Sequence, residues 1–281
     1  MAATFRGLVR GLVCLGFVTS ASAGIISISE TNGDPGKSSI IEPSGSSNGS
    51  FFQEDAFAMV DRSHECNGVA FDSLGRLTTG SGGDPAIATI QGLPAYLVGK
   101  PYIANANDNK DNAGYSLTIN VDAPSYVYLM IDNRVGDENN KDIPTLGSGG
   151  IGPMAWVADL GFVLVNTGLS PNGQPDFVGV DEGPYTSIAP GLRSHSAAGL
   201  GVGPGVELNQ FFSVYAKLVS STITLGEQND GTTRNMYGVV VASVPEPSTF
   251  GLLALGAALL QIGRAQRRRG CPVRTTERCR E

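Results

Sequence analysis

Residues 115–131 read YSLTINVDAPSYVYLMI, and this stretch decides the fold class. From residue 115 to residue 121 every odd position is apolar and every even position is polar, which is the period of a strand with one buried face. The Asp-Ala-Pro at 122–124 predicts a turn. The continuously apolar run at 126–131 then predicts a strand that is buried on both faces. A half-exposed strand followed by a fully buried one indicates two sheets packed face to face.

The rest of the central region supports an all-β chain. Glycine accounts for 38 of the 281 residues, which suits short strands joined by many turns. The Asn-Asp-Gly at 229–231 is a strong turn signal, and no amphipathic helix is evident. The sequence therefore predicts an antiparallel β-sandwich. Further strands are expected over 24–29, over 212–218, around Ile223 and Leu225, and over 236–242.

Charge is unevenly distributed along the chain. The formal net charge is −7, but the segment from Gly24 to Val244 holds ten Lys and Arg against 23 Asp and Glu, a net charge of −13. Such a body repels phosphate backbones, so no nucleic-acid partner is expected.

The first 23 residues have the layout of a secretory signal peptide. Two arginines precede a short apolar core at 12–18, and Ala21 and Ala23 form a small-residue cleavage site. The apolar core is too short to cross a bilayer, so we expect cleavage after Ala23. An exported body over 24–243 would follow.

The C-terminal region 244–269 reads VPEPSTFGLLALGAALLQIGRAQRRR. Its apolar run, 250–262, would reach about 20 Å as a helix, against a hydrocarbon core of roughly 30 Å. Arginines after a marginal apolar helix should remain on the cytoplasmic side and stop transfer. The sequence therefore predicts a short apolar helix that anchors the chain transiently in the membrane. The arginines concerned are Arg264, Arg267, Arg268 and Arg269.

This tail resembles the PEP-CTERM sorting signal of exopolysaccharide-producing Gram-negative bacteria. The motif Pro245-Glu246-Pro247, the apolar segment and the arginine cluster occur in the order typical of that signal. The resemblance implies that an exosortase-type membrane protease recognises the motif and removes the tail. The chain departs from the pattern at 270–281, a basic extension expected to be cytoplasmic. An ordinary permanent single-pass anchor is the alternative.

The body resembles galactose-binding-like jelly rolls over residues 102–242. The resemblance rests on strand-like segments, and it implies a sandwich of the kind that accompanies polysaccharide-degrading enzymes. The long Gly- and Pro-rich insertion at 167–209 and the Ser-Ser at 220–221 depart from that pattern. The matching segments are 126–134, 155–157, 212–217 and 222–226.

One group of residues is a candidate glycan site. Trp156 is the sole tryptophan, while Asp132 and Arg134 lie where a strand is expected to run into a loop. Together they would form a shallow polar site with a stacking face. In the alternative interpretation Trp156 belongs to the core and Asp132 pairs with Arg134 as a brace at the end of the strand.

Two oxygen-rich loops are candidate calcium sites. Asp108 and Asp111 lie in the first, at 105–112, and Asp137 and Asp142 lie in the second, at 137–142. Carboxylates interleaved with amides are ligands that Ca²⁺ accepts. The alternative is that these residues form Asx-turns and solvate the loops.

Catalysis is not expected. The G-x-S-x-G pattern at 45–49 has no helical pattern behind it, which that chemistry requires. Cys66 and His64 would share one face of a strand, but a tolerated lone cysteine is the simpler interpretation. We therefore expect an exported cell-surface or matrix protein that binds extracellular polysaccharide or serves structurally. A secreted polysaccharide hydrolase or lyase is the alternative class.

Overall fold

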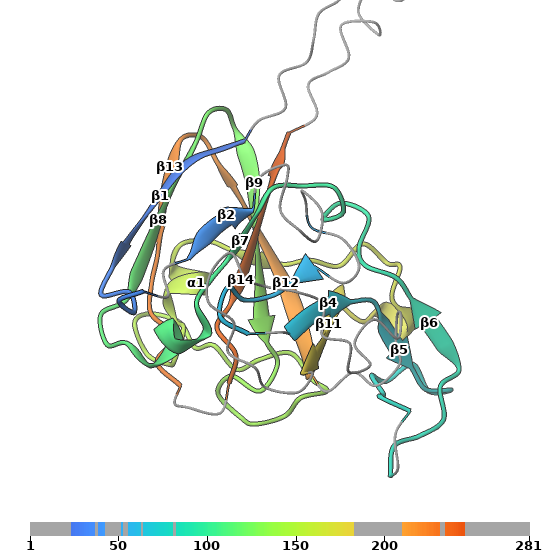
Figure 1. Cartoon of the computed structure of the whole chain (residues 1–281). Helices are drawn as coiled ribbons and strands as arrows, with labels where there is room; N and C mark the ends of the chain where they lie inside the picture. The colour runs from blue at the N-terminus through green and yellow to red at the C-terminus, as the bar shows by residue number, and fades with distance from the viewer. Residues whose placement is uncertain are drawn as a thin grey trace, which may run out of the picture. The chain divides into compact units, whose positions relative to one another are not determined.

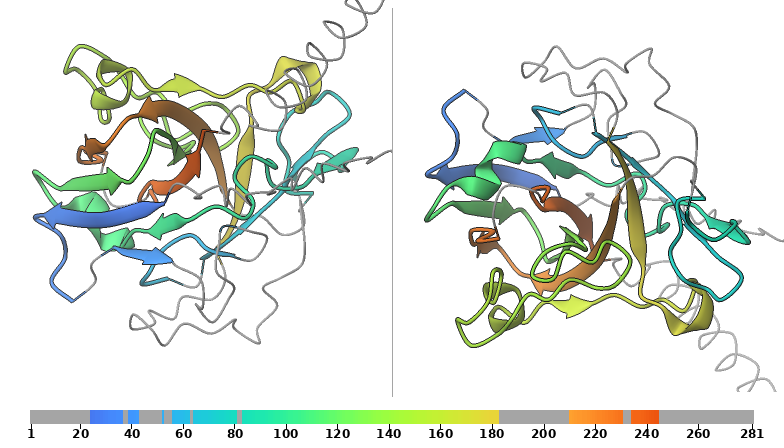
Figure 2. Two further views of the ribbon diagram at one scale, coloured as in Figure 1. Left: turned by 90° about the horizontal axis from the view of Figure 1, so that it is seen from above. Right: turned by 90° about the horizontal axis from the view of Figure 1, so that it is seen from below.

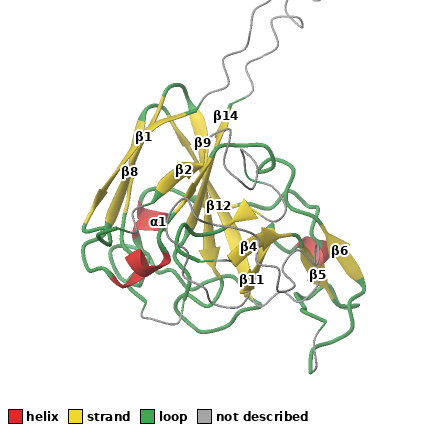
Figure 3. Ribbon diagram, viewed as in Figure 1, coloured by secondary structure: helices red, strands yellow, loops and turns green. Residues whose placement is uncertain are grey.

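The computed structural model describes residues 24–36, 39–42, 52, 56–62, 64–80, 83–182, 210–230 and 234–244. They fall within one compact unit, Ala23–Val244, in which strands predominate (Figures 1 and 3). Several predicted features lie outside the described residues, namely the signal-peptide residues Ala21 and Ala23, the motif Pro245-Glu246-Pro247, the apolar segment 250–262, and the arginines 264 and 267–269.

The smaller of the two facing sheets has three antiparallel strands in the order β1-β8-β13. Its central strand, β8, alternates between buried and half-buried positions along its length, which confirms the predicted period of two. Leu117 and Ile119 point into the core from this strand and are fully buried. The bounds of the three strands are β1 Ile25–Thr31, β8 Ser116–Val121 and β13 Thr222–Leu225.

The larger sheet has nine strands in the described part of the chain, and its neighbouring strands pair antiparallel. Its order is β2-β7-β14-β9-β12-β11-β4-β3, with β10 pairing separately along β12. Seen along a perpendicular direction, the sheet curves strongly at β12 (Figure 2). The bounds are β2 Ile40–Glu42, β3 Ala56–Phe57, β4 His64–Asn67, β7 Tyr102–Ala104, β9 Ser125–Asp132, β10 Val163–Leu164, β11 Phe177–Glu182, β12 Gln210–Val219 and β14 Gly238–Ser243.

The remaining elements are short. Strands β5 (Val69–Phe71) and β6 (Thr89–Gln91) form a separate antiparallel pair. The α-helix α1 spans Trp156–Asp159, and two 3₁₀ helices span Asn107–Asp111 and Pro171–Gly173. Among the residues described, no helix has both the length and the apolar character needed to cross a membrane. The sandwich class predicted from the sequence is confirmed.

The larger sheet carries apolar side chains on both faces. On one face, Leu129 and Ile131 of β9 join Leu117 and Ile119 of β8 in a single buried cluster. On the other face, Met130 belongs to a second cluster, together with Phe212 and Val214 of β12 and with loop residues such as Leu97. The middle of the larger sheet is therefore covered on both sides, which explains the continuously apolar sequence of β9.

The prediction that residues 126–131 are buried throughout is wrong at the start of the strand. Tyr126 is exposed and Tyr128 is half-buried, whereas the residues from Leu129 to Asp132 are all buried. The apolar run does not predict this difference in burial, because a tyrosine counts as apolar in the sequence whether its ring is exposed or buried. At its first positions β9 alternates, and it becomes buried on both faces only towards Asp132.

Two strand connections cross between the sheets at the same end of the sandwich. The turn after Val121 carries the chain from β8 to β9, and Ser220-Ser221 carries it from β12 to β13. The two crossings touch, because the Val121 N–H donates to the Ser221 carbonyl at 2.7 Å. The start of β1 and the end of β14 lie at this end as well (Figure 1). We call it the terminal end of the body.

Candidate functional site

Asp132 is the last residue of β9, and its carboxylate is fully buried. Arg134 donates to it from Nε at 3.0 Å and from Nη2 at 2.6 Å, and its backbone N–H donates at 3.0 Å. The backbone N–H of Asn235 donates to Asp132 Oδ2 at 2.9 Å. The carboxylate therefore joins the end of β9 to the segment that leads into β14. This arrangement is the brace of the alternative interpretation.

Arg134 is held from several sides. Its carbonyl accepts a hydrogen bond of 2.8 Å from Nε of Arg234, which also pairs with Asp230 at 3.3 Å. The side chain of Arg134 retains 21% exposure, whereas that of Asp132 retains none. A ligand could reach part of the guanidinium, but the carboxylate beside it is already occupied by protein donors.

Trp156 begins the short helix α1. Its ring is packed against other protein groups more closely than the ring of a sugar-stacking platform would be. Its indole N–H donates to the Glu227 carbonyl at 2.8 Å. The ring meets Tyr237 and Phe162 edge-on, at centroid distances of 5.6 and 6.4 Å. A Cβ placed on Gly226 would lie 2.8 Å from Trp156 Cδ1, so that glycine backbone presses directly on the indole. The half-buried ring therefore contributes mainly to packing.

The carboxylates of the first predicted calcium loop form ion pairs with basic side chains of the protein. Asp108 pairs with Arg62, which also pairs with Asp61 at 2.9 Å. Asp61 in turn accepts a hydrogen bond of 2.8 Å from the Asn107 backbone N–H. Asp111 lies 3.4 Å from Nζ of Lys110. These ion pairs fasten the loop at 105–112 to the segment around Asp61.

The second loop forms turns of its own. Asp137 Oδ1 accepts the Asn139 N–H at 2.9 Å and Oδ2 accepts the Thr145 hydroxyl at 2.8 Å, while Asp142 accepts the Asn139 side-chain amide at 2.6 Å. The Asp137–Asn139 bond is an Asx-turn. Across the described part of the chain, no three His, Cys, Asp or Glu side chains gather as metal ligands would.

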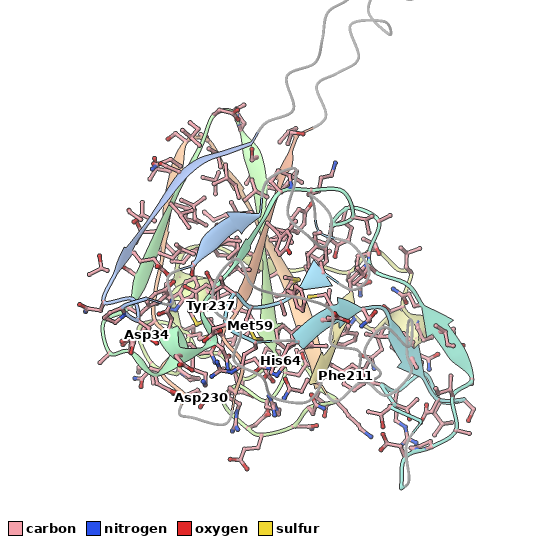
Figure 4. The ribbon with its side chains drawn as sticks, viewed as in Figure 1. Asp34, Met59, His64, Phe211, Asp230 and Tyr237 are labelled. Atoms are coloured by element: carbon pink, nitrogen blue, oxygen red, sulfur yellow. The ribbon has the colours of Figure 1, made fainter. Side chains whose placement is uncertain are left out.

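His64 is buried on β4 (Figure 4). Burial, together with the smaller effects of the positive charges of Arg62, Arg134 and Lys110, lowers the pKa of His64 to about 4. The histidine is therefore neutral at physiological pH. Cys66, two residues along, is 1% exposed and pairs in register with Ala56 and Val180 inside the second apolar cluster. A thiol in such surroundings is poorly placed to act as a nucleophile.

Sequence reasoning missed a strip of three tyrosines. The rings of Tyr96 and Tyr128 lie with centroids 4.9 Å apart, and those of Tyr128 and Tyr126 lie 6.0 Å apart. Burial raises the pKa of Tyr128, whose hydroxyl is partly withdrawn from water. The two strand tyrosines share a face because they are two positions apart. Tyr96 comes from a distant loop, and no local pattern identifies it as their neighbour.

The body begins and ends against one turn. The Gly24 N–H donates to Asp122 Oδ1 at 2.8 Å, and the Val244 N–H donates to the Pro124 carbonyl at 3.4 Å. Ser243, the last residue of β14, pairs in register with Ser125 of β9. The segment that follows Val244 therefore leaves from the terminal end of the body.

Comparison with known families identifies the segment that begins there. Residues 243–269 match the model of the PEP-CTERM protein-sorting motif. This match confirms the sorting signal predicted from the tail, and such a signal indicates an exported protein that is sorted at the membrane by an exosortase. No curated protein and no solved structure matches the chain, so the resemblance of 102–242 to galactose-binding-like modules gains no support.

Proposed function

We propose that this chain is an exported, non-catalytic protein of the exopolysaccharide matrix, which an exosortase-type protease releases from the membrane. The observation that carries the proposal is the junction between body and motif. The match begins at Ser243, where β14 ends, and Val244 still donates a hydrogen bond to the body. Cleavage at or after Pro245 would therefore leave every strand of the described body in place.

The position of β14 restricts where the chain can be cleaved without disrupting the body. It lies in the interior of the larger sheet, between β7 and β9, and Val239, Val240 and Val241 are fully buried. Cleavage upstream of Ser243 would remove ladder hydrogen bonds and buried apolar surface together. The protease must therefore act on the residues just beyond the sheet if a folded product is to be released.

A binding or structural role suits the polar groups better than catalysis does. Both oxygens of Asp132 accept hydrogen bonds from protein donors, and the carboxylates of the two oxygen-rich loops hold turns or ion pairs. These groups stabilise the fold as they stand. In the proposal, the body contributes a stable, strongly acidic sandwich to the matrix, and polysaccharide is its partner.

Processing can be tested in the native host with one variant and a matched control. Glu246→Ala alters the motif, whereas Glu277→Ala makes the same change of charge beyond the arginine cluster. We expect Glu246→Ala to remain in the membrane fraction with its tail attached and Glu277→Ala to be released like the unaltered chain. Mass spectrometry of each product measures the C-terminus. Recovery of the unaltered chain from envelopes with 250–269 intact would support permanent anchorage instead.

The matrix role has a separate test. The purified body should be retained on immobilised exopolysaccharide of the host and should generate no new reducing ends or unsaturated products during incubation with it. Release of such products would favour the alternative class of hydrolase or lyase. Passage through the column without retention would leave the sorting step standing and remove the polysaccharide partner.

A further inference from the structure

Three large apolar side chains are exposed at the terminal end of the body. Ile26 retains 62% of its surface, Leu218 retains 52% and Tyr126 retains 38%. Ile26 is exposed because it is the extra residue of a β-bulge, since Ile25 pairs with Val121 and Ser27 with Asn120. Tyr126 and Leu218 face each other across the β9–β12 ladder. Tyr126 and Leu218 lie on the face of the larger sheet turned away from β8, and Ile26 lies on the outer side of β1. We call these three residues, which flank one end of the sandwich, the apolar end patch.

The patch lies beside the point where the sorting signal leaves the sandwich. Tyr126 pairs in register with Ala242 of β14, two residues before Val244. Ile26 lies two residues after Gly24, whose N–H donates to Asp122. In the same turn, the Pro124 carbonyl accepts a hydrogen bond from the Val244 N–H. Exposed apolar side chains of both sheets therefore flank this exit, on the two opposite outer faces of the sandwich.

The length of the connection constrains where this end lies before release. Five residues, 245–249, separate Val244 from the apolar segment that starts at Phe250. Fully extended, the chain from Val244 to Phe250 spans about 20 Å at most. The headgroup layer occupies roughly 6 Å of that distance, because a bilayer is about 40–45 Å thick around its 30 Å hydrocarbon core. While the segment is inserted, the terminal end therefore lies within about 14 Å of the headgroup surface and can contact it.

The chemistry of the patch matches that surface. Tyrosine is enriched at membrane interfaces, where its ring contacts apolar chains and its hydroxyl remains in the polar layer. The ring of Tyr126 lies next to that of the half-buried Tyr128, with centroids 6.0 Å apart, so the exposed ring packs against a second one. The net charge of −13 of the body opposes contact with anionic headgroups, which leaves zwitterionic lipid as the favoured partner.

We propose that the apolar end patch rests on zwitterionic lipid headgroups while the tail anchors the chain, and that it separates from them on release. This proposal rests on the proposed function, because it requires the inserted tail. The contact orients the body so that the turn at 122–124 and the adjoining motif lie at the membrane surface, where a membrane protease acts.

The test uses the full chain in phosphatidylcholine vesicles whose acyl chains carry bromine, a quencher of tryptophan fluorescence. Leu218→Trp places an indole in the patch. Ile143→Trp is the matched control, because Ile143 is 44% exposed and lies in the loop that Thr145 attaches to Val135, beyond the far end of β9. Eight residues of β9 separate the two ends by about 23 Å. Trp156 is common to both variants and sets the background.

We expect brominated lipid to abolish most of the emission added at position 218 and none of that added at position 143. Equal quenching at the two positions, or quenching at neither, would overturn the proposal. So would an indole at position 218 that responds to host polysaccharide but not to lipid. Protease protection of a C-terminal fragment reports insertion of the tail independently. If that protection is absent, the proposed sorting function has failed as well.

Discussion

The backbone nitrogen of Gly24 lies 2.8 Å from Asp122 Oδ1, although 98 residues separate the two in sequence. If the signal peptide is cleaved after Ala23, that nitrogen becomes the α-ammonium group of the mature chain. The same hydrogen bond then joins two opposite charges. Export would in this way strengthen a contact at the end of the body that also carries the sorting signal.

The first prediction concerns this pair. Asp122→Asn keeps an acceptor oxygen but removes the charge, so the chain that begins at Gly24 should lose up to ~1 kcal/mol of unfolding free energy, the upper range for exposed ion pairs. A chain that retains Ala23 carries its ammonium one residue away and should lose less. Urea unfolding of both chains, each with and without Asp122→Asn, measures the difference in unfolding free energy. Equal losses in both backgrounds would show that charge plays no part.

The second prediction concerns His64. Because burial and, to a smaller extent, nearby positive charges lower its folded pKa from 6.5 to about 4, the unfolded chain binds a proton more readily than the folded chain between these values. The stability is therefore fully present above pH 6.5 and falls as the pH decreases towards 4, by about 3 kcal/mol at about 1.4 kcal/mol per pKa unit. His64→Gln should flatten this part of the pH profile, whatever its effect at pH 7. An unchanged slope would assign the loss to other groups.

A third prediction separates the brace from a ligand site. Asp132→Ala leaves the Arg134 guanidinium and the Asn235 N–H without their shared acceptor, so it should cost ~3 kcal/mol of unfolding free energy, as for other broken buried pairs. Arg134→Gln should cost less, because an amide can still donate to the carboxylate. Chemical denaturation measures both. If Arg134→Gln abolishes retention on polysaccharide while stability is unchanged, Arg134 is a binding residue.

A fourth prediction addresses Trp156. Trp156→Phe removes the hydrogen bond to the Glu227 carbonyl but keeps a ring against Tyr237. We expect a loss of ~1 kcal/mol, the usual net contribution of such a bond, and unchanged retention on polysaccharide. Affinity chromatography beside thermal unfolding tests both parts. Loss of retention in a stable variant would restore the glycan platform inferred from the sequence.

The fifth prediction concerns calcium. Asp137 and Asp142 already accept hydrogen bonds within their loop, and Asp108 is paired with Arg62, so a cation would have to displace these partners. We expect neither millimolar Ca²⁺ nor EDTA to shift the melting temperature of the body. A rise in melting temperature with Ca²⁺ that Asp137→Asn removes would restore the calcium site.

The sequence was informative where a feature depends on residues close together in the chain. The alternation in β8 and the apolar core of β9 were predictable because successive side chains of a strand point to opposite faces. The tail was recognisable for the same kind of reason, since its motif, apolar segment and arginines follow one another directly. The candidate glycan residues were chosen by residue type and expected strand ends, which is weaker evidence.

By itself, therefore, the sequence determined the strand-rich class, the main strands of the sandwich and the sorting signal in the tail. Only the tertiary structure decided that Asp132 meets Asn235, 103 residues away, and that Tyr96 stacks on Tyr128. The physical reason is the range of the interactions. Periodicity is set by backbone geometry between neighbours, whereas these contacts form only when long loops close and many strands pair at once.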